Sequence, residues 1–457
     1  MNLFLKNTLH PIGRGMPAED RTAALVALMI GIFATSIETS IANTALPTIA
    51  RELGVSEAAS TWVASSYQLA MVAVLLPAAA LGEVVGHRRV FLGGLLAFGL
   101  ASLFCGLSTS LPALVFWRFV QGMGAAGVMG ISGALVRVIY PASALGRGMG
   151  TNALVVGLAF AGGPSVASAV LSVASWQWLF LFNVPLCGVA IWAGRRSLPL
   201  TATSPHGFDG VAAVLCAALL GTTVYTLTEA AHFADGLQVV GCAVLAVVLL
   251  VLLLRRQAGH QAPILAIDLL RGRIFSLAAV TAICSFAAQA LAFVSLPFML
   301  QTVLGYSQVE TGFLITPWPL MVALMAPVAG RLSDRVRPAV LVGLGMATMS
   351  IGLCLLALLP AQATPADILW RLAVCGTGFG LFQSPNLRTL MGGAPPARSG
   401  SASGMIATFR LLGQSSGVAL VAACFHVSSV QGATYALWLG AAFTALAVGI
   451  TVVRLRA

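Results

Sequence analysis

Charged side chains are scarce in this sequence of 457 residues: only 8% are Asp, Glu, Lys or Arg, whereas soluble domains carry about 25%. Because hydrophobic residues make up 59% of the chain, a water-soluble globule is excluded, and the composition indicates an integral membrane protein. Basic residues outnumber acidic ones by 24 to 13, but they occur singly or in pairs between apolar runs. They form no basic stripe, so the excess does not indicate nucleic-acid binding.

The sequence also lacks cysteine pairs with the spacing of a metal site or a redox centre. Its eight cysteines stand singly inside apolar runs, where cysteine acts as a small hydrophobic residue. The glycine pattern at 122–127 lies inside an apolar run, so it indicates close helix packing rather than a dinucleotide site. The stretches 195–209 and 255–273 contain prolines and are too short for a soluble enzyme domain. We therefore expect no enzyme, no cofactor and no bound metal.

Long apolar runs are what the sequence has in abundance. A helix needs about 20 apolar residues to cross the hydrocarbon core, and none of these runs alternates as a barrel strand does. Fourteen runs are found, and they begin near Thr22, Trp62, Val90, Leu111, Met149, Leu179, Gly210, Leu237, Phe275, Gly312, Ala339, Asp367, Ala402 and Thr434. The sequence therefore predicts an all-α polytopic membrane protein with 14 transmembrane helices.

Two parts of the chain repeat each other at a nearly constant offset. LVFWR at 114–118 returns as DILWR at 367–371, an offset of 253, and LGE at 81–83 returns as LSD at 332–334, an offset of 251. Internal duplication is common in polytopic membrane proteins. We therefore expect a six-helix bundle in residues 1–198, another in 273–457, and two inserted transmembrane helices with cytoplasmic linkers in 199–272.

The basic residues also set the predicted orientation. With the N-terminus inside the cell, 20 basic residues fall in inner loops and termini, and only Arg51 falls in an outer loop. Loops rich in Lys and Arg stay on the cytoplasmic side. We therefore expect a multi-pass protein of the cell (inner) membrane with both termini in the cytoplasm.

Four motifs resemble those of the major facilitator superfamily. Residues 117–125 (WRFVQGMGA) are similar to its motif B, and residues 162–164 (GGP) to its antiporter motif C. Residues 82–89 (GEVVGHRR) resemble motif A, and residues 330–335 (GRLSDR) its second copy. The resemblance implies the major facilitator fold, with two six-helix bundles that rock about a midplane site by alternating access.

Three further stretches are similar to the fourteen-helix drug:proton antiporter branch of that family. They are residues 38–47 (ETSIANTALP), 62–67 (WVASSY) and 176–185 (WQWLFLFNVP). This resemblance implies a multidrug efflux transporter, driven by the proton gradient, that exports amphipathic cationic or neutral drugs or toxic compounds. Its implied partners are that small molecule, protons and the lipid bilayer, and the protein is expected to be a monomer.

Charges inside the apolar runs are candidates for function, because a charge at bilayer depth costs at least about 2.5–3.5 kcal/mol. Glu38 is the single carboxylate well inside a run. It lies roughly 13 Å and Arg118 roughly 10 Å from the outer ends of their helices, at a rise of about 1.5 Å per residue. The resemblance implies that this pair couples protons, since Arg keeps its charge while the carboxylate gains or loses a proton. The alternative is a permanent ion pair that only fixes helix packing.

Two other arginines lie in apolar runs of the second half. Arg371 follows Asp367 by four residues, which predicts a local ion pair on one helix face. Arg410 either snorkels to the cytoplasmic headgroups or acts as a gate or a contact for an anionic substrate. An alternative function is therefore export of an anionic metabolite or siderophore, with Arg118 or Arg410 as the counter-charge. A non-transporting membrane scaffold or sensor is a further alternative, although it has no need of Glu38.

Two larger sets of residues complete the predicted site. The motif A and motif C residues are expected to form a cytoplasmic latch and a kinked hinge: Gly82, Glu83, Arg88, Arg89, Gly330, Asp334, Arg335, Gly162, Gly163 and Pro164. Polar and aromatic residues within the spans are candidates for the substrate cavity, where aromatic rings suit a lipophilic cation. They are Asn43, Tyr67, Gln68, Trp318, Phe382, Gln383 and Asn386.

Overall fold

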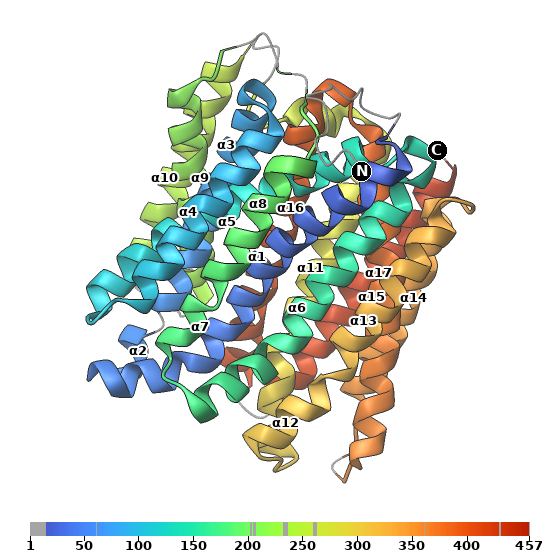
Figure 1. Ribbon diagram of the computed structural model, residues 1–457. Helices are drawn as coiled ribbons and strands as arrows, with labels where there is room; N and C mark the ends of the chain where they lie inside the picture. The colour runs from blue at the N-terminus through green and yellow to red at the C-terminus, as the bar shows by residue number, and fades with distance from the viewer. Residues whose placement is uncertain are drawn as a thin grey trace.

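The computed structural model describes residues 15–60, 62–201, 203, 207–231, 236–258, 263–360, 362–428 and 431–456. Every regular element in these residues is a helix (Figure 1). The first half contains α1 (Ala18–Leu53), α2 (Glu57–Ser60), α3 (Trp62–Val85), α4 (His87–Gly106), α5 (Leu111–Ile139), α6 (Leu145–Val173), α7 (Gln177–Leu181) and α8 (Asn183–Ser197). The inserted helices are α9 (Gly210–Ala231) and α10 (Gly236–Gln257). The second half contains α11 (Arg273–Phe298), α12 (Gln308–Ile315), α13 (Pro317–Ser333), α14 (Pro338–Ala357), α15 (Pro365–Gly393), α16 (Ser399–Val427) and α17 (Gly432–Arg456).

The predicted spans and the observed helices agree closely. Each predicted start lies within 4 residues of a helix start, and the sixth and tenth spans are broken into the pairs α7–α8 and α12–α13. In the described residues, 12 helices are long and apolar enough to cross a membrane. The fifth and twelfth predicted spans correspond to helices α6 and α15, which have 29 residues each. The all-helical polytopic fold is therefore confirmed, whereas the count of 14 spans stays a prediction.

The duplication is visible in the packing of corresponding helix pairs. A Cβ atom on Gly124 of α5 would lie 2.5 Å from the backbone nitrogen of Phe98 on α4. A Cβ atom on Gly378 of α15 would lie 2.5 Å from the backbone nitrogen of Met349 on α14. Only glycine permits so close an approach of two helices at these two positions. The same small-residue contact thus builds both halves.

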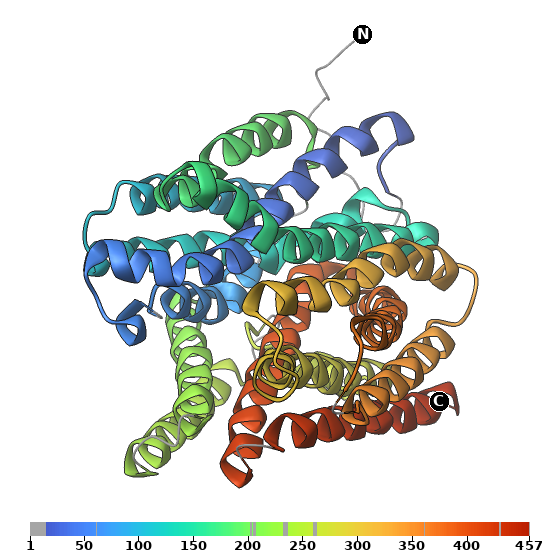
Figure 2. The ribbon, with the colours of Figure 1, turned by 90° about the horizontal axis from the view of Figure 1, so that it is seen from below.

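The two inserted helices lie at the periphery, where the two halves meet (Figure 2). Helix α10 packs on α9, and α9 packs on both α3 of the first half and α16 of the second. The carboxylate of Asp209, just before α9, accepts hydrogen bonds from Arg256 of α10 at 2.9 and 3.0 Å. The insert is therefore a helical hairpin that spans the seam between the halves.

The halves are joined at one end of the molecule, the end where α1 begins and α17 ends (Figure 1). We call it the proximal end and the opposite one the distal end. Helices α6 and α13 show how the contact changes along the seam: a Cβ on Gly150 would lie 2.8 Å from the carbonyl oxygen of Ala326, and one on Gly157 3.6 Å from Ala323. A Cβ on Gly162, further toward the distal end, would meet nothing within 4 Å. The seam is therefore tight at the proximal end and loosens toward the distal end.

Candidate functional site

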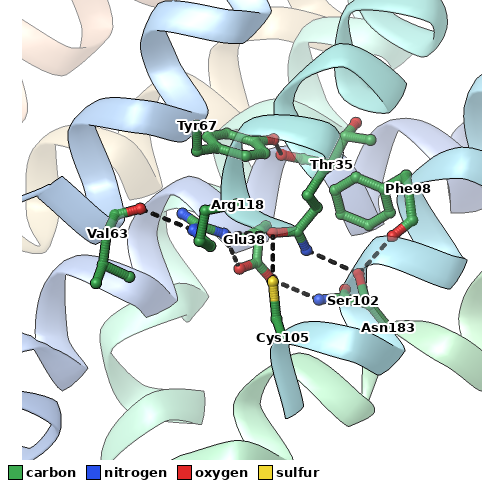
Figure 3. A network of polar contacts seen from close by, with 10 residues as sticks. Thr35, Glu38, Val63, Tyr67, Phe98, Ser102, Cys105, Arg118 and Asn183 are labelled. Carbon is green, nitrogen blue, oxygen red and sulfur yellow. Dashed lines mark hydrogen bonds and ion pairs between the residues drawn. The ribbon is translucent and has the colours of Figure 1, made fainter. Parts of the chain in front are cut away.

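A buried ion pair lies within the first half. Nη1 of Arg118 on α5 is 2.5 Å from Oε1 of Glu38 on α1, and the two side chains are 1% and 0% exposed (Figure 3). The sequence placed the two charges at similar depth, and the structure brings them into contact. Because the pair is closed off from solvent, its two charges compensate each other at short range.

Arg118 is held on several sides by the helices around it. Its Nε donates to the carbonyl oxygen of Val63 on α3 at 2.8 Å, and Nη1 also donates to Oε1 of Gln121 at 2.6 Å (Figure 3). The guanidinium lies 4.5 Å from the ring centre of Tyr67 and 5.4 Å from that of Phe180. Such cation–π contacts stabilise a desolvated cation. Arg118 is therefore held by contacts from α3, α5 and α7 in addition to its ion pair with Glu38.

The second oxygen of Glu38 is bound by Asn183, the first residue of α8. The amide nitrogen of Asn183 donates to Oε2 of Glu38, while Oδ1 of Asn183 is buried and has no hydrogen-bond partner among the described residues. An unpaired buried acceptor is costly, so its presence beside a titratable group calls for a functional explanation. The sequence analysis did not single out Asn183, although it lies in the WQWLFLFNVP stretch.

The network continues from Gln121 toward α4. Nε2 of Gln121 donates to the hydroxyl of Ser102 at 2.7 Å, and that hydroxyl donates to the carbonyl oxygen of Phe98 at 2.7 Å. Gln121 follows Arg118 by one helical turn, which is the signal that could have identified it. The site thus joins α1, α3, α4, α5 and α8, and a change at Glu38 can reach all of them.

The second half contains no equivalent pair among the residues that the structure describes. The position that corresponds to Glu38 is Leu291, which is fully buried in an apolar cluster. Arg371 donates to the carbonyl oxygen of Leu355 at 2.7 Å, and its guanidinium lies 5.3 Å from the ring of Trp370. Asp367 instead caps the start of α15 through Thr364, so the predicted Asp367–Arg371 ion pair is wrong. A capped helix start satisfies Asp367 locally and leaves Arg371 free to bind the backbone.

The acids of the two motif A copies cross between the halves at the proximal end. Oε1 of Glu83 on α3 accepts a hydrogen bond from the backbone N–H of Ser401 in the first turn of α16, at 2.7 Å. Oδ1 of Asp334, after α13, accepts from the N–H of Gly146 in the first turn of α6, at 3.0 Å. A carboxylate at a helix N-terminus is favoured by the free N–H groups and by the helix dipole. Each half therefore caps a helix of the other.

The arginines that support this latch differ from those expected. Arg388 and Arg147 lie 3.5 and 3.8 Å from the Asp334 carboxylate. Arg137, at the end of α5, donates to the carbonyl oxygen of Ala394 at 2.8 Å and to the hydroxyl of Ser399 at 3.2 Å. These three arginines reach the latch from the ends of helices and were missed by the sequence analysis.

The predicted loop arginines take no part in these contacts between the halves. Arg88 donates to the carbonyl oxygen of Arg195 in its own half, and the side chains of Arg89 and Arg335 are exposed. The motif A acids could cap helix ends or bind the loop arginines; they cap helix ends here, and the described residues show no contact between them and Arg88, Arg89 or Arg335. These arginines are close to the motif A acids in the sequence. Their side chains nevertheless extend from the helix ends toward solvent or toward their own half, and not toward the seam.

One motif A glycine allows the halves to approach each other, and the other allows packing within its own half. A Cβ on Gly330 would lie 2.5 Å from the carbonyl oxygen of Gly146 in the other half, whereas one on Gly82 would lie 2.9 Å from Ile131 on α5 of the same half. At the predicted hinge on α6, Gly163 is buried, Gly162 has open space beside it, and the side chain of Pro164 is outside the described residues. The hinge role of these three stays a prediction.

The predicted cavity residues occupy three kinds of position. Four of them are buried in helix packing: Tyr67, Trp318, Phe382 and Asn386. Tyr67 covers Arg118 and donates its hydroxyl to the carbonyl oxygen of Thr35 at 3.1 Å. Gln68 is exposed, Gln383 is half-buried, and the side chain of Asn43 is outside the described residues. The buried four do not face a substrate in this conformation, and a role in the cavity stays a prediction.

Comparison with known proteins gives consistent results. Residues 28–418 match the Major Facilitator Superfamily. The chain is 45% identical over 443 residues to the uncharacterized transporter YebQ of Escherichia coli (strain K12), covering 96% of this chain and 97% of YebQ. It is 30% identical over 430 residues to the multidrug resistance protein Stp of Mycobacterium tuberculosis (strain CDC 1551 / Oshkosh), covering 91% of this chain and 76% of Stp. Its fold is similar, with a TM-score of 0.70 at 13% identity, to the crystal structure of the human organic anion transporter MFSD10, over 95% of this chain and 100% of that one.

The all-helical fold, with 12 helices in the described residues that are long and apolar enough to cross a membrane, defines the class of this protein, which is that of the polytopic α-helical membrane proteins. The family match spans most of the chain, and so does the relative at 45% identity. The chain belongs to the Major Facilitator Superfamily, and it is a transporter rather than an enzyme.

Proposed function

We propose that this chain is a proton-coupled antiporter of the inner membrane, which exports amphipathic small molecules such as drugs or toxic compounds. The observation that carries the proposal is the sealed Glu38–Arg118 pair, which has no counterpart in the described second half. A carboxylate can be neutralised by a proton, whereas the arginine beside it keeps its charge. The pair is therefore a two-state element that responds to protons.

The orientation of the transport cycle follows from the charges of the loops. The 20 basic residues assigned to the inner side support a cytoplasmic position for the proximal end. Because the halves contact each other at that end, this conformation is the outward-facing one. Because Glu38 is sealed in this conformation, its exchange of protons with the outside needs a local opening around the ion pair, and its exchange with the cytoplasm follows once the latch has opened.

The hydrogen bonds around Glu38 suggest how both charge states are accommodated. While Glu38 is ionised, it accepts from Arg118 and from the amide nitrogen of Asn183. A protonated Glu38 carries an O–H that needs an acceptor, and the unpaired Oδ1 of Asn183 provides one after the amide rotates. Loss of the negative charge also weakens the hold on Arg118, and disruption of a buried pair costs about 3–5 kcal/mol. A free-energy change of that size is enough to shift a two-state equilibrium between the halves.

The names of related proteins support a class of substrate for this chain. Stp is named a multidrug resistance protein, which supports export of drug-like compounds by this chain as well. A cationic substrate would compete with the proton if it reached the Glu38 carboxylate. In this conformation that carboxylate is fully buried and bound by Arg118 and Asn183, so it offers a cation no free partner.

A direct test measures substrate movement and proton movement across the membrane in the same experiment. The purified protein is reconstituted into liposomes that contain a pH-sensitive dye, and a substrate identified by a resistance screen in an efflux-deficient host is added. We expect substrate movement in one direction to drive protons in the other, with no proton movement in protein-free liposomes. Substrate transport without any proton movement would contradict antiport, and the absence of any transport would favour a membrane scaffold or sensor.

A further inference from the structure

Arg410 is a cation near the middle of α16 that faces the first half. It follows Ser403 by seven residues, about two helical turns, and therefore lies on the same helix face. Ser403 shows where that face points, because its hydroxyl accepts a hydrogen bond from the backbone N–H of Gly133 on α5, at 3.2 Å. Arg410 thus faces the seam between the halves rather than the lipid.

Snorkelling does not explain Arg410. The helix begins at Ser399, so Arg410 lies roughly 16 Å along it at a rise of about 1.5 Å per residue. That is deeper than the headgroup region, and its helix face is turned away from lipid. Within the described part of the chain, Arg410 forms no hydrogen bond and no ion pair, although it is only half-buried. A charge at this depth without a protein partner needs water or a ligand to compensate it.

Polar side chains from both halves accompany Arg410. Gln414 lies one turn further along α16 and is half-buried. On α3, Gln68 precedes Ala79 by eleven residues, about three turns, and so shares its face. That face meets α16 at the proximal end, where a Cβ on Gly404 would lie 2.8 Å from Cβ of Ala79, but at Gln68 it is exposed. Gln68 therefore lies on the seam face of α3, in the part of the seam that is not closed.

The charge balance along the seam is positive. The carboxylate of Glu38 is bound by Arg118 and sealed within the first half. Glu83 is bound at the proximal end by the start of α16. Glu38 is the only carboxylate well inside a predicted span. Arg410 is therefore the charge that the seam presents to a bound molecule.

We infer that Arg410, with Gln68 and Gln414, forms a binding site for the anionic group of an amphipathic substrate, such as a carboxylate or a sulfonate. A guanidinium binds a carboxylate through two parallel N–H donors, and the side-chain amides supply further donors. The apolar part of the ligand lies along the apolar helix surfaces that flank the seam. This inference rests on the proposed transport function, because it assigns the chemical class of the substrate.

The test compares two dyes that share one ring system and differ in charge. Binding of carboxyfluorescein, an anion, and of rhodamine 123, a cation, is measured by fluorescence anisotropy on the purified full-length protein. We expect the anion to bind more tightly, and Arg410→Gln to weaken its binding about tenfold or more, the effect of losing a charged hydrogen bond. Arg410→Lys should give intermediate affinity, since it keeps the charge but not the two-pronged geometry.

A matched control removes the same charge elsewhere. Arg371→Gln takes one arginine from the second turn of α15 in the same half, where its partner is a backbone carbonyl. This variant should bind the anion as the unchanged protein does. Gel filtration and Tm measurements confirm that all three variants are folded. Unchanged anion binding by Arg410→Gln, or tighter binding of the cation than of the anion by the unchanged protein, overturns the inference.

The outcome separates this inference from the proposed function. If proton-driven transport requires Glu38 but anion binding does not depend on Arg410, the antiporter proposal is supported and the anion site is refuted. If anion binding requires Arg410 but transport does not respond to a pH gradient, the antiporter proposal is refuted and the anion site is supported.

Discussion

Asn183 donates a hydrogen bond to Glu38 through its amide nitrogen, while its amide oxygen is buried and finds no partner in the part of the chain that the structure describes. The residue therefore fits the ionised carboxylate in this conformation and holds an acceptor ready for the protonated one. In the proposed cycle, one amide would serve both charge states of the site by rotation.

Replacement of this amide tests its part in proton coupling. In Asn183→Leu, Glu38 loses a donor to its charged form, which costs about 1–3 kcal/mol. We expect a lower Tm and loss of pH-driven transport. Ser384→Ala is the control, because Ser384 is a buried polar residue of the second half that donates to the carbonyl oxygen of Ala326 at 3.0 Å. The control should lower the Tm as well but keep the response to the pH gradient, and equal loss of that response in both variants would refute a specific role for Asn183.

The crossed helix caps predict which conformation the latch favours. In the double variant Glu83→Ala and Asp334→Ala, two helix starts lose their charged acceptors, at about 1–3 kcal/mol each. The proximal end should then open and the distal end close. Spin labels at Leu107 and Leu358, which are exposed after the equivalent helices α4 and α14, report the distal distance in a background without the native cysteines. We expect this distance to shorten, and an unchanged distance distribution would show that the caps do not hold the latch.

A substitution at Gly162 should cause a defect in the transport rate but no defect in folding. A Cβ at this position meets nothing within 4 Å here, so Gly162→Ala should fold with an unchanged Tm. If the distal end closes as the proximal end does, α6 must approach α13 at this point, and the added methyl group obstructs the approach. The transport rate should fall severalfold, whereas Gly188→Ala, where a Cβ also meets nothing within 4 Å, should have no effect. Equal rates for the two variants would speak against closure at Gly162.

Helix positions and the buried pair could be predicted because they depend on features that a sequence carries locally. Apolar runs give the spans to within a few residues, and two isolated charges at similar depth gave the contact between Glu38 and Arg118. The crossing of Glu83 and Asp334 to the opposite half could not be foreseen, because it depends on how the two bundles are arranged in space. The Asp367–Arg371 prediction failed for a related reason. Spacing allowed the pair, but a capping contact with Thr364 was available at the helix start.

The central claim is that Glu38 carries the coupling proton. Glu38→Gln keeps the shape and the hydrogen-bonding capacity of the side chain but cannot be charged. The decisive measurement compares two assays on this variant in proteoliposomes: substrate exchange without a gradient, and substrate accumulation driven by a pH gradient. The account predicts that exchange continues while pH-driven accumulation is abolished. Full pH-driven accumulation by Glu38→Gln would contradict it.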